Sequence, residues 1–159
     1  MTRLLATLLL FGAAPLAAQA TDPVGVWQIE EATSWIRIER TPAGSLLGRL
    51  VWVAEPDDSL GRPKTDINNP DKSRRGDPIL GMQILTGFRE GKPGEWKDGT
   101  IYDGRNGKSY RGTITLAGTD SLKLRGYIKI GFVKAGRTSV WTRIRRPVAP
   151  DSGSALYTP

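Results

Sequence analysis

Ser121–Ile130 reads SLKLRGYIKI, and apolar and charged residues alternate along it. In an extended chain Leu122, Leu124 and Ile128 fall on one face, and the lysines and the arginine fall on the other. This period of two predicts a β-strand with one face against a core. The preceding residues, Ala117–Asp120, combine glycine with aspartate and predict a tight turn.

Similar segments of β-type residues recur on both sides, separated by clusters of glycine, proline, asparagine and aspartate about every ten residues. Because the turns are short and no helical period is sustained after residue 21, we predict a closed eight-stranded antiparallel up-and-down barrel, which leaves no unpaired edge strand. The other candidate strands are Val24–Glu31, Ser34–Thr41, Ser45–Ala54, Met82–Glu90, Glu95–Asp103, Lys108–Ala117 and Arg137–Arg145.

One connection is much longer than the others. The residues between Ala54 and Leu80 are polar and contain several prolines. A loop of this length inside a compact domain is typical of a lid, a binding loop or a disordered segment. Within it, Asn69 is expected to cap a single helical turn that starts at Pro70.

The first twenty residues, 1–20, predict a signal peptide and therefore export to the periplasm. Arg3 precedes an apolar run, Leu4–Ala14, and Ala18–Ala20 gives the small-x-small pattern that signal peptidase accepts. The run is shorter than the roughly 20 residues that a membrane-spanning helix needs, so we do not expect an integral membrane protein. The barrel domain is expected over residues 21–146 and a flexible C-terminal tail over residues 147–159.

The chain contains no cysteine and no histidine. Disulfides, thiolate nucleophiles, histidine bases and the common zinc sites are therefore excluded. No carboxylates are positioned as a catalytic pair, so we expect no catalysis, no cofactor and no metal. The net charge of +7 suggests an anionic partner; export argues against nucleic acid and favours an anionic envelope surface.

Several separated motifs resemble one bacterial exported family, known as domain of unknown function 2147. They occur in the expected order at Asp66–Asp71, Pro78–Leu85, Tyr102–Tyr110, Leu122–Ile128 and Gly136–Arg143. The resemblance covers nearly all of the chain after the leader. It implies a lipocalin-like or avidin-like barrel in the periplasm, and it implies no activity because the family has none assigned.

Gly25-Val26-Trp27 also resembles the Gly-x-Trp opening of lipocalins. The resemblance implies that Trp27 closes one end of the barrel and that an arginine of the last strand, here Arg143, lies over its ring. A cation over an indole stabilises by about 0.5–2 kcal/mol. We interpret Trp27 and Arg143 as a structural plug.

An eight-stranded barrel is either filled by side chains or holds one small ligand. The first hypothesis is a module that binds a small lipophilic or anionic ligand, gated by the 54–80 loop. The second is an envelope interaction protein with a filled barrel, whose basic surface contacts membrane or cell wall. If the barrel is open, the candidate ligand-binding residues are Trp52, Trp96, Tyr102, Tyr110, Arg125, Tyr127 and Arg137.

Overall fold

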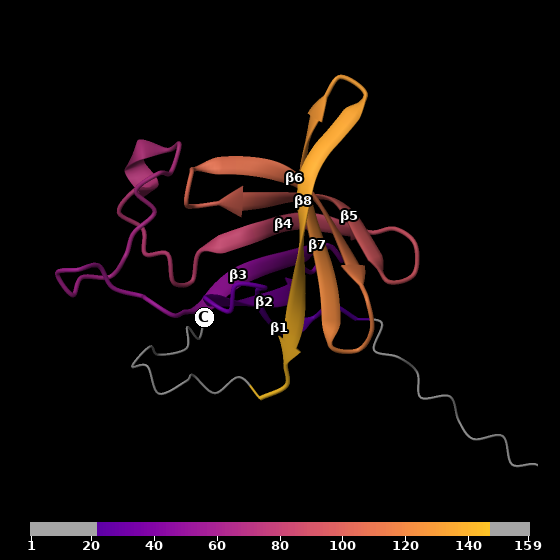
Figure 1. The fold of residues 1–159 in the computed structure, drawn as a ribbon, viewed down its shortest axis with the longest axis horizontal. Coiled ribbons are helices and arrows are strands. Elements are labelled where there is room, and N and C mark those ends of the chain that lie inside the picture. Colours follow the sequence, from indigo (N-terminus) through magenta and orange to yellow (C-terminus); the bar gives the residue numbers. More distant parts are fainter. Residues whose placement is uncertain (1–21, 147–159) are drawn as a thin grey trace, which may run out of the picture.

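A computed structural model describes residues 22–146 and confirms the closed barrel (Figure 1). Every strand pairs antiparallel with its neighbours in chain order, and the last pairs with the first. The predicted signal peptide and C-terminal tail lie outside the described residues. The strands are β1 (Gly25–Gln28), β2 (Ser34–Arg40), β3 (Leu46–Val53), β4 (Gln83–Glu90), β5 (Glu95–Asp103), β6 (Lys108–Leu116), β7 (Ser121–Ile130) and β8 (Val133–Ile144).

The two largest departures from the predicted strands lie in β1 and β8. β1 ends at Gln28, because the chain turns at Ala32, whose φ is 54°. β8 begins at Val133 instead of Arg137 and pairs with β7 up to a two-residue turn. Gly131 is the first residue of that turn, and its φ is 60°. A turn with this backbone conformation matches the right-handed twist of the two strands that it joins.

The closed end of the barrel is filled by large side chains. Trp27, Phe88 and Trp96 are almost completely buried there, together with Leu46 and Leu122. The guanidinium carbon of Arg143 lies 4.2 Å from the Trp27 ring centroid, so the expected contact is present. The Trp27 indole nitrogen donates to the carbonyl of Pro23 at 2.8 Å, which satisfies its one polar atom.

A β-bulge in β3 creates a second, smaller core on the outer face of the barrel. Trp35 pairs with Trp52, but Ile36 pairs with Leu50, so β3 contains one extra residue at this point. Val51 and Trp52 therefore both join the outer cluster, where the Trp35 and Trp52 ring centroids are 5.0 Å apart. Another bulge lies in β5, between Trp96 and Gly99, where the glycine permits a bend.

The 54–80 connection is an ordered loop beside the open end of the barrel (Figure 1). Two isolated bridges hold it, Asp57 with Pro63 and Thr65 with Pro78. Its helical turn is a 3₁₀-helix, η1 (Lys72–Arg74), capped by Asp71. The predicted cap at Asn69 is therefore wrong by two residues. None of the helices in residues 22–146 is long and apolar enough to cross a membrane.

Candidate functional site

A cavity of about 1240 Å³ occupies the end of the barrel opposite Trp27 and opens to solvent. Its walls are mainly apolar and come from strands all around the barrel. Ile36, Leu50, Ile101, Leu124 and Trp141 represent β2, β3, β5, β7 and β8. The barrel is thus filled at one end and hollow at the other, which is the shape of a small-molecule site.

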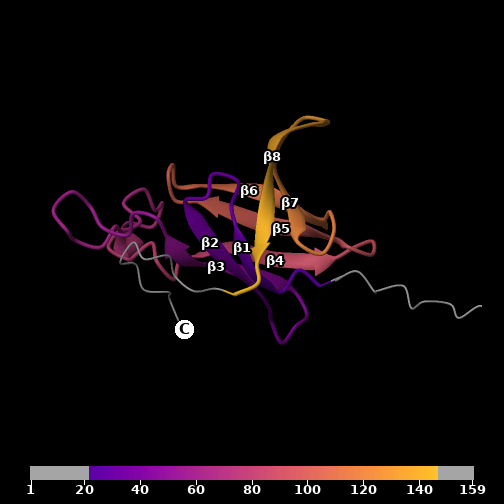
Figure 2. The ribbon, with the colours of Figure 1, turned by 60° about the horizontal axis from the view of Figure 1, so that its bottom comes forward.

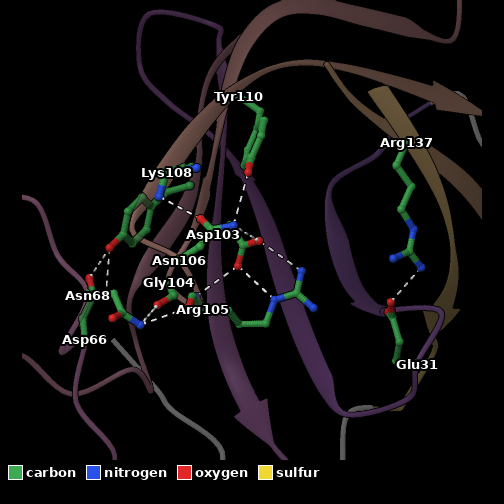
Figure 3. A network of polar contacts seen from close by, with 11 residues as sticks. Glu31, Asp66, Asn68, Asp103, Gly104, Arg105, Asn106, Lys108, Tyr110 and Arg137 are labelled. Carbon is green, nitrogen blue, oxygen red and sulfur yellow. Dashed lines mark hydrogen bonds and ion pairs between the residues drawn. The ribbon is translucent and has the colours of Figure 1, made fainter. Parts of the chain in front are cut away.

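The charged residues that line the cavity all form ion pairs with one another (Figure 3 shows two of the pairs). Four acids and four bases are involved, so the lining carries no net charge. The pairs are Arg62–Asp58 at 2.8 Å, Lys64–Glu55 at 3.0 Å, Arg105–Asp103 at 2.9 Å and Arg137–Glu31 at 3.1 Å.

Asp103 and Arg105 are held at the turn between β5 and β6. The Arg105 side chain donates two hydrogen bonds to the Asp103 carboxylate, and the Arg105 backbone N–H donates a third. The Arg105 guanidinium holds the pKa of Asp103 below its usual value, and the Asp103 carboxylate in turn raises the pKa of Arg105. Asn106 joins the same carboxylate to the Tyr110 hydroxyl, at 3.2 Å to each (Figure 3).

The long loop is fastened to the same turn by a buried carboxylate. Asp66 is only 2% exposed, and both of its carboxylate oxygens lie within 2.9 Å of the Tyr102 hydroxyl. The Asn69 amide donates to the same carboxylate at 2.7 Å. Next to it, the Asn68 amide donates to the carbonyls of Gly104 and Arg105 (Figure 3).

Residues 66–71 carry several side chains with oxygen atoms, and these form the loop anchor and the cap of η1. Asp66 is bonded to Tyr102 and Asn69, and Asp71 accepts from the backbone and the hydroxyl of Ser73. Within residues 22–146, no group of three or more acidic side chains is placed to hold a metal ion.

Burial and, after it, the hydrogen bond to Asp66 raise the pKa of Tyr102 to about 12. A tyrosine whose pKa is higher in the folded protein stabilises the fold fully below its unfolded value of 10.0 and loses that contribution as the pH rises through about 12. We therefore expect the free energy of unfolding to fall between pH 10 and pH 12, and to fall less in Tyr102→Phe. Urea titrations across this range check the difference; equal slopes would show that Tyr102 is not linked to folding.

Gly107 lies where the loop meets the β5–β6 turn. Its φ is 68°, and a Cβ at this position would overlap the carbonyl oxygen of Asn68. Gly107→Ala is expected to destabilise by about 1–3 kcal/mol through strain and overpacking, and to make the 54–80 loop more sensitive to proteolysis. Gly44→Ala is the matched control, because Gly44 also has a positive φ, of 83°, but open space around it. Equal effects in both variants would exclude the Asn68 contact as the cause.

Three of the predicted ligand-binding residues line the cavity: Tyr102, Tyr110 and Arg137. Trp52 lies in the outer cluster, because the bulge in β3 turns it away from the lumen. Trp96 belongs to the core cluster at the filled end. Neither tryptophan contributes to the cavity wall.

Arg125 and Tyr127 also lie outside the cavity wall. Both are on the face of β7 opposite Leu124, as strict alternation requires. Arg125 is exposed, and Tyr127 is covered by Lys134, whose ammonium lies 4.7 Å from the ring centroid.

Several residues of the cavity wall, most of them apolar, were not among the sequence candidates. Trp141 and Ser139 follow Arg137 at intervals of two along β8, so alternation from Arg137 would have found them. Ile84 and Ile101 lie in strands whose faces are mixed by bulges, and no simple pattern marks them.

Residues 25–143 match a family described as an uncharacterized protein conserved in bacteria, DUF2147. The chain belongs to this family. Among solved structures it is similar to the protein HP1028 from Helicobacter pylori, which is described as a member of the lipocalin family. The TM-score is 0.65 and the identity 20%, over 84% of this chain and 96% of that one, so the likeness establishes a lipocalin-like fold. No curated protein matches the sequence.

Proposed function

We propose that this DUF2147 protein is a binding module that holds a small lipophilic molecule in its barrel and carries out no catalysis. The observation that supports this is the apolar cavity of about 1240 Å³ at one end of a barrel whose other end is closed. Eight-stranded barrels of the lipocalin type are of a size that holds one small ligand. Residues 1–20 favour export, so we place this function in the periplasm.

The pairing of charges favours a lipophilic ligand over an anionic one. All four cations of the cavity lining are already engaged by carboxylates. An anion would have to compete with these carboxylates, whereas an apolar body needs only the walls around Leu124 and Trp141. At the same end the Tyr110 hydroxyl accepts from Asn106 and can donate its own proton to a polar group on the ligand.

Two related fluorescent probes test the proposal. N-phenyl-1-naphthylamine is neutral, and 8-anilino-1-naphthalenesulfonate has nearly the same body with one negative charge. We expect saturable binding of the neutral probe, with one site per chain, and weaker binding of the anionic probe. Absence of saturable binding of the neutral probe would contradict the proposal, and a clear preference for the sulfonate would contradict the assignment of a lipophilic ligand.

The loop is proposed to control access to the cavity. Lys64, Thr65 and Ile67 line the cavity from this loop, and Asp66 fixes the loop to Tyr102 between them. Releasing this anchor is therefore expected to change the rates of probe entry and exit more than the equilibrium affinity. Stopped-flow measurements with N-phenyl-1-naphthylamine give the entry and exit rates for wild type and for Tyr102→Phe, and equilibrium titrations give the affinity of each.

A further inference from the structure

The β7–β8 hairpin extends beyond the rest of the barrel, as two views of the molecule show (Figures 1 and 2). Its outer part carries large apolar side chains that contact little of the protein. Ile130 is 62% exposed, Val133 is 66% exposed and Phe132 is fully exposed. Such a group on a projecting tip is unusual for a surface that meets only water.

The hairpin has two chemically different faces. Ile130 pairs with Val133, so these side chains lie on one face, the same face on which Leu124 lines the cavity. Lys129 pairs with Lys134 on the opposite face. An apolar face and a cationic face thus meet at one tip.

The charge around the tip has a single sign. From Arg125 to Thr138, which pair with each other across the hairpin, the sequence contains four lysines and arginines and no acidic residue. The acids bonded to β8 and its end lie away from the tip: Glu31 binds Arg137, Glu30 accepts from the Val140 N–H, and Asp120 binds Arg145 at the far end. A second copy of this tip would bring like charges together, whereas an anionic surface complements them.

We propose that the β7–β8 tip docks on an anionic lipid bilayer. Ile130, Phe132 and Val133 enter the headgroup boundary, while Lys129 and Lys134 contact lipid phosphates. This surface function goes beyond cavity binding and does not depend on it.

The placement of the hairpin also links the bilayer to the cavity. Gly126 pairs with Arg137 at the base of the exposed segment, and both line the cavity. Ile130 is four residues from Gly126 along β7, which corresponds to about 13 Å of extended strand. A docked tip therefore holds one wall of the cavity within that distance of the lipid.

Sedimentation of the full chain with vesicles tests the docking. We expect binding to vesicles that contain phosphatidylglycerol, weak binding to phosphatidylcholine alone, and loss of binding at high salt. Phe132→Ser should weaken binding about ten-fold through lost apolar contact. Lys129→Gln and Lys134→Gln should each weaken it by about five-fold.

Matched variants elsewhere on the surface distinguish docking by the tip from nonspecific adsorption to vesicles. Leu60 is 72% exposed in the long loop, and Lys92 and Lys108 are exposed lysines outside the hairpin. Leu60→Ser, Lys92→Gln and Lys108→Gln should leave vesicle binding unchanged. Equal losses in these controls, undiminished binding of Phe132→Ser, or tip-dependent self-association in place of vesicle binding would overturn the proposal. Phe132→Ser should still bind N-phenyl-1-naphthylamine. A loss of vesicle binding in this variant can therefore be told apart from a loss of ligand binding in the cavity.

Because the chain contains no cysteine, a single introduced cysteine can carry a dye that reports on the surroundings of the tip. Val133→Cys can be labelled at one site with the environment-sensitive dye NBD, and Leu60→Cys gives the matched label on the loop. We expect a blue shift and a rise in intensity at position 133 with anionic vesicles, and neither at position 60. A label at 133 that stays in water while the protein is vesicle-bound would also overturn the proposal.

Discussion

Trp27→Ala is expected to lower the free energy of unfolding by about 3–5 kcal/mol. Trp27 is completely buried at the filled end of the barrel, so its removal leaves a cavity among side chains that cannot all collapse into it. It also removes the ring beneath Arg143 and the donor to the carbonyl of Pro23. Arg143 itself donates to the carbonyls of Asp22, Val24 and Thr119, so the plug ties together three segments of the chain.

Trp27→Phe is the control for this effect, because it keeps an aromatic ring under Arg143 and removes the indole donor. We expect it to cost about 1–2 kcal/mol, clearly less than alanine. Urea unfolding followed by far-ultraviolet circular dichroism measures both variants. A loss of less than about 1 kcal/mol for Trp27→Ala would show that the filled end does not depend on this plug.

Gly126→Phe is expected to weaken binding of N-phenyl-1-naphthylamine about ten-fold, by placing an aromatic ring in the space that the probe would occupy. Gly126 lines the cavity from β7, and its Cβ would meet only Cδ1 of Ile101, at 3.4 Å, and Cβ of Tyr110, at 3.9 Å. A phenyl ring at this position can therefore point into the cavity without displacing backbone. The fold should persist, with unchanged circular dichroism.

Gly76→Phe provides the comparison, since Gly76 lies in the loop, has open space around it and does not line the cavity. It adds the same side chain and should leave probe binding unchanged. If Gly126→Phe folds and binds the probe as tightly as wild type, the probe site lies outside the barrel.

The barrel could be predicted from the sequence because its strands alternate and its turns are short. β5 and β7 begin and end at the predicted residues. The start of β8 could not be predicted in the same way: Lys134, Ala135 and Gly136 are weak strand formers, and they are extended because β7 continues opposite them. Pairing between distant residues thus overrode local preference.

The cavity was harder to predict than the fold. Its depth depends on where the bulkiest residues lie along the barrel axis, and that requires the register of every strand pair. Trp96 and Phe88 fill the closed end, while Leu124 and Ile101 face open space. Bulges changed the faces further, as they did for Trp52. Tyr102 and Tyr110 were within reach of the sequence because they lie near the β5–β6 turn at the open rim, whereas Arg137 lies inside β8, opposite Gly126.

Native mass spectrometry of the protein purified from the periplasm without detergent tests the binding function most directly. We expect a discrete added mass on wild type, lost after denaturing extraction, and a much smaller fraction of Gly126→Phe carrying it, because the new ring occupies part of the site. A bare mass for wild type, or the same added mass at undiminished occupancy on Gly126→Phe, would contradict a ligand held in the barrel.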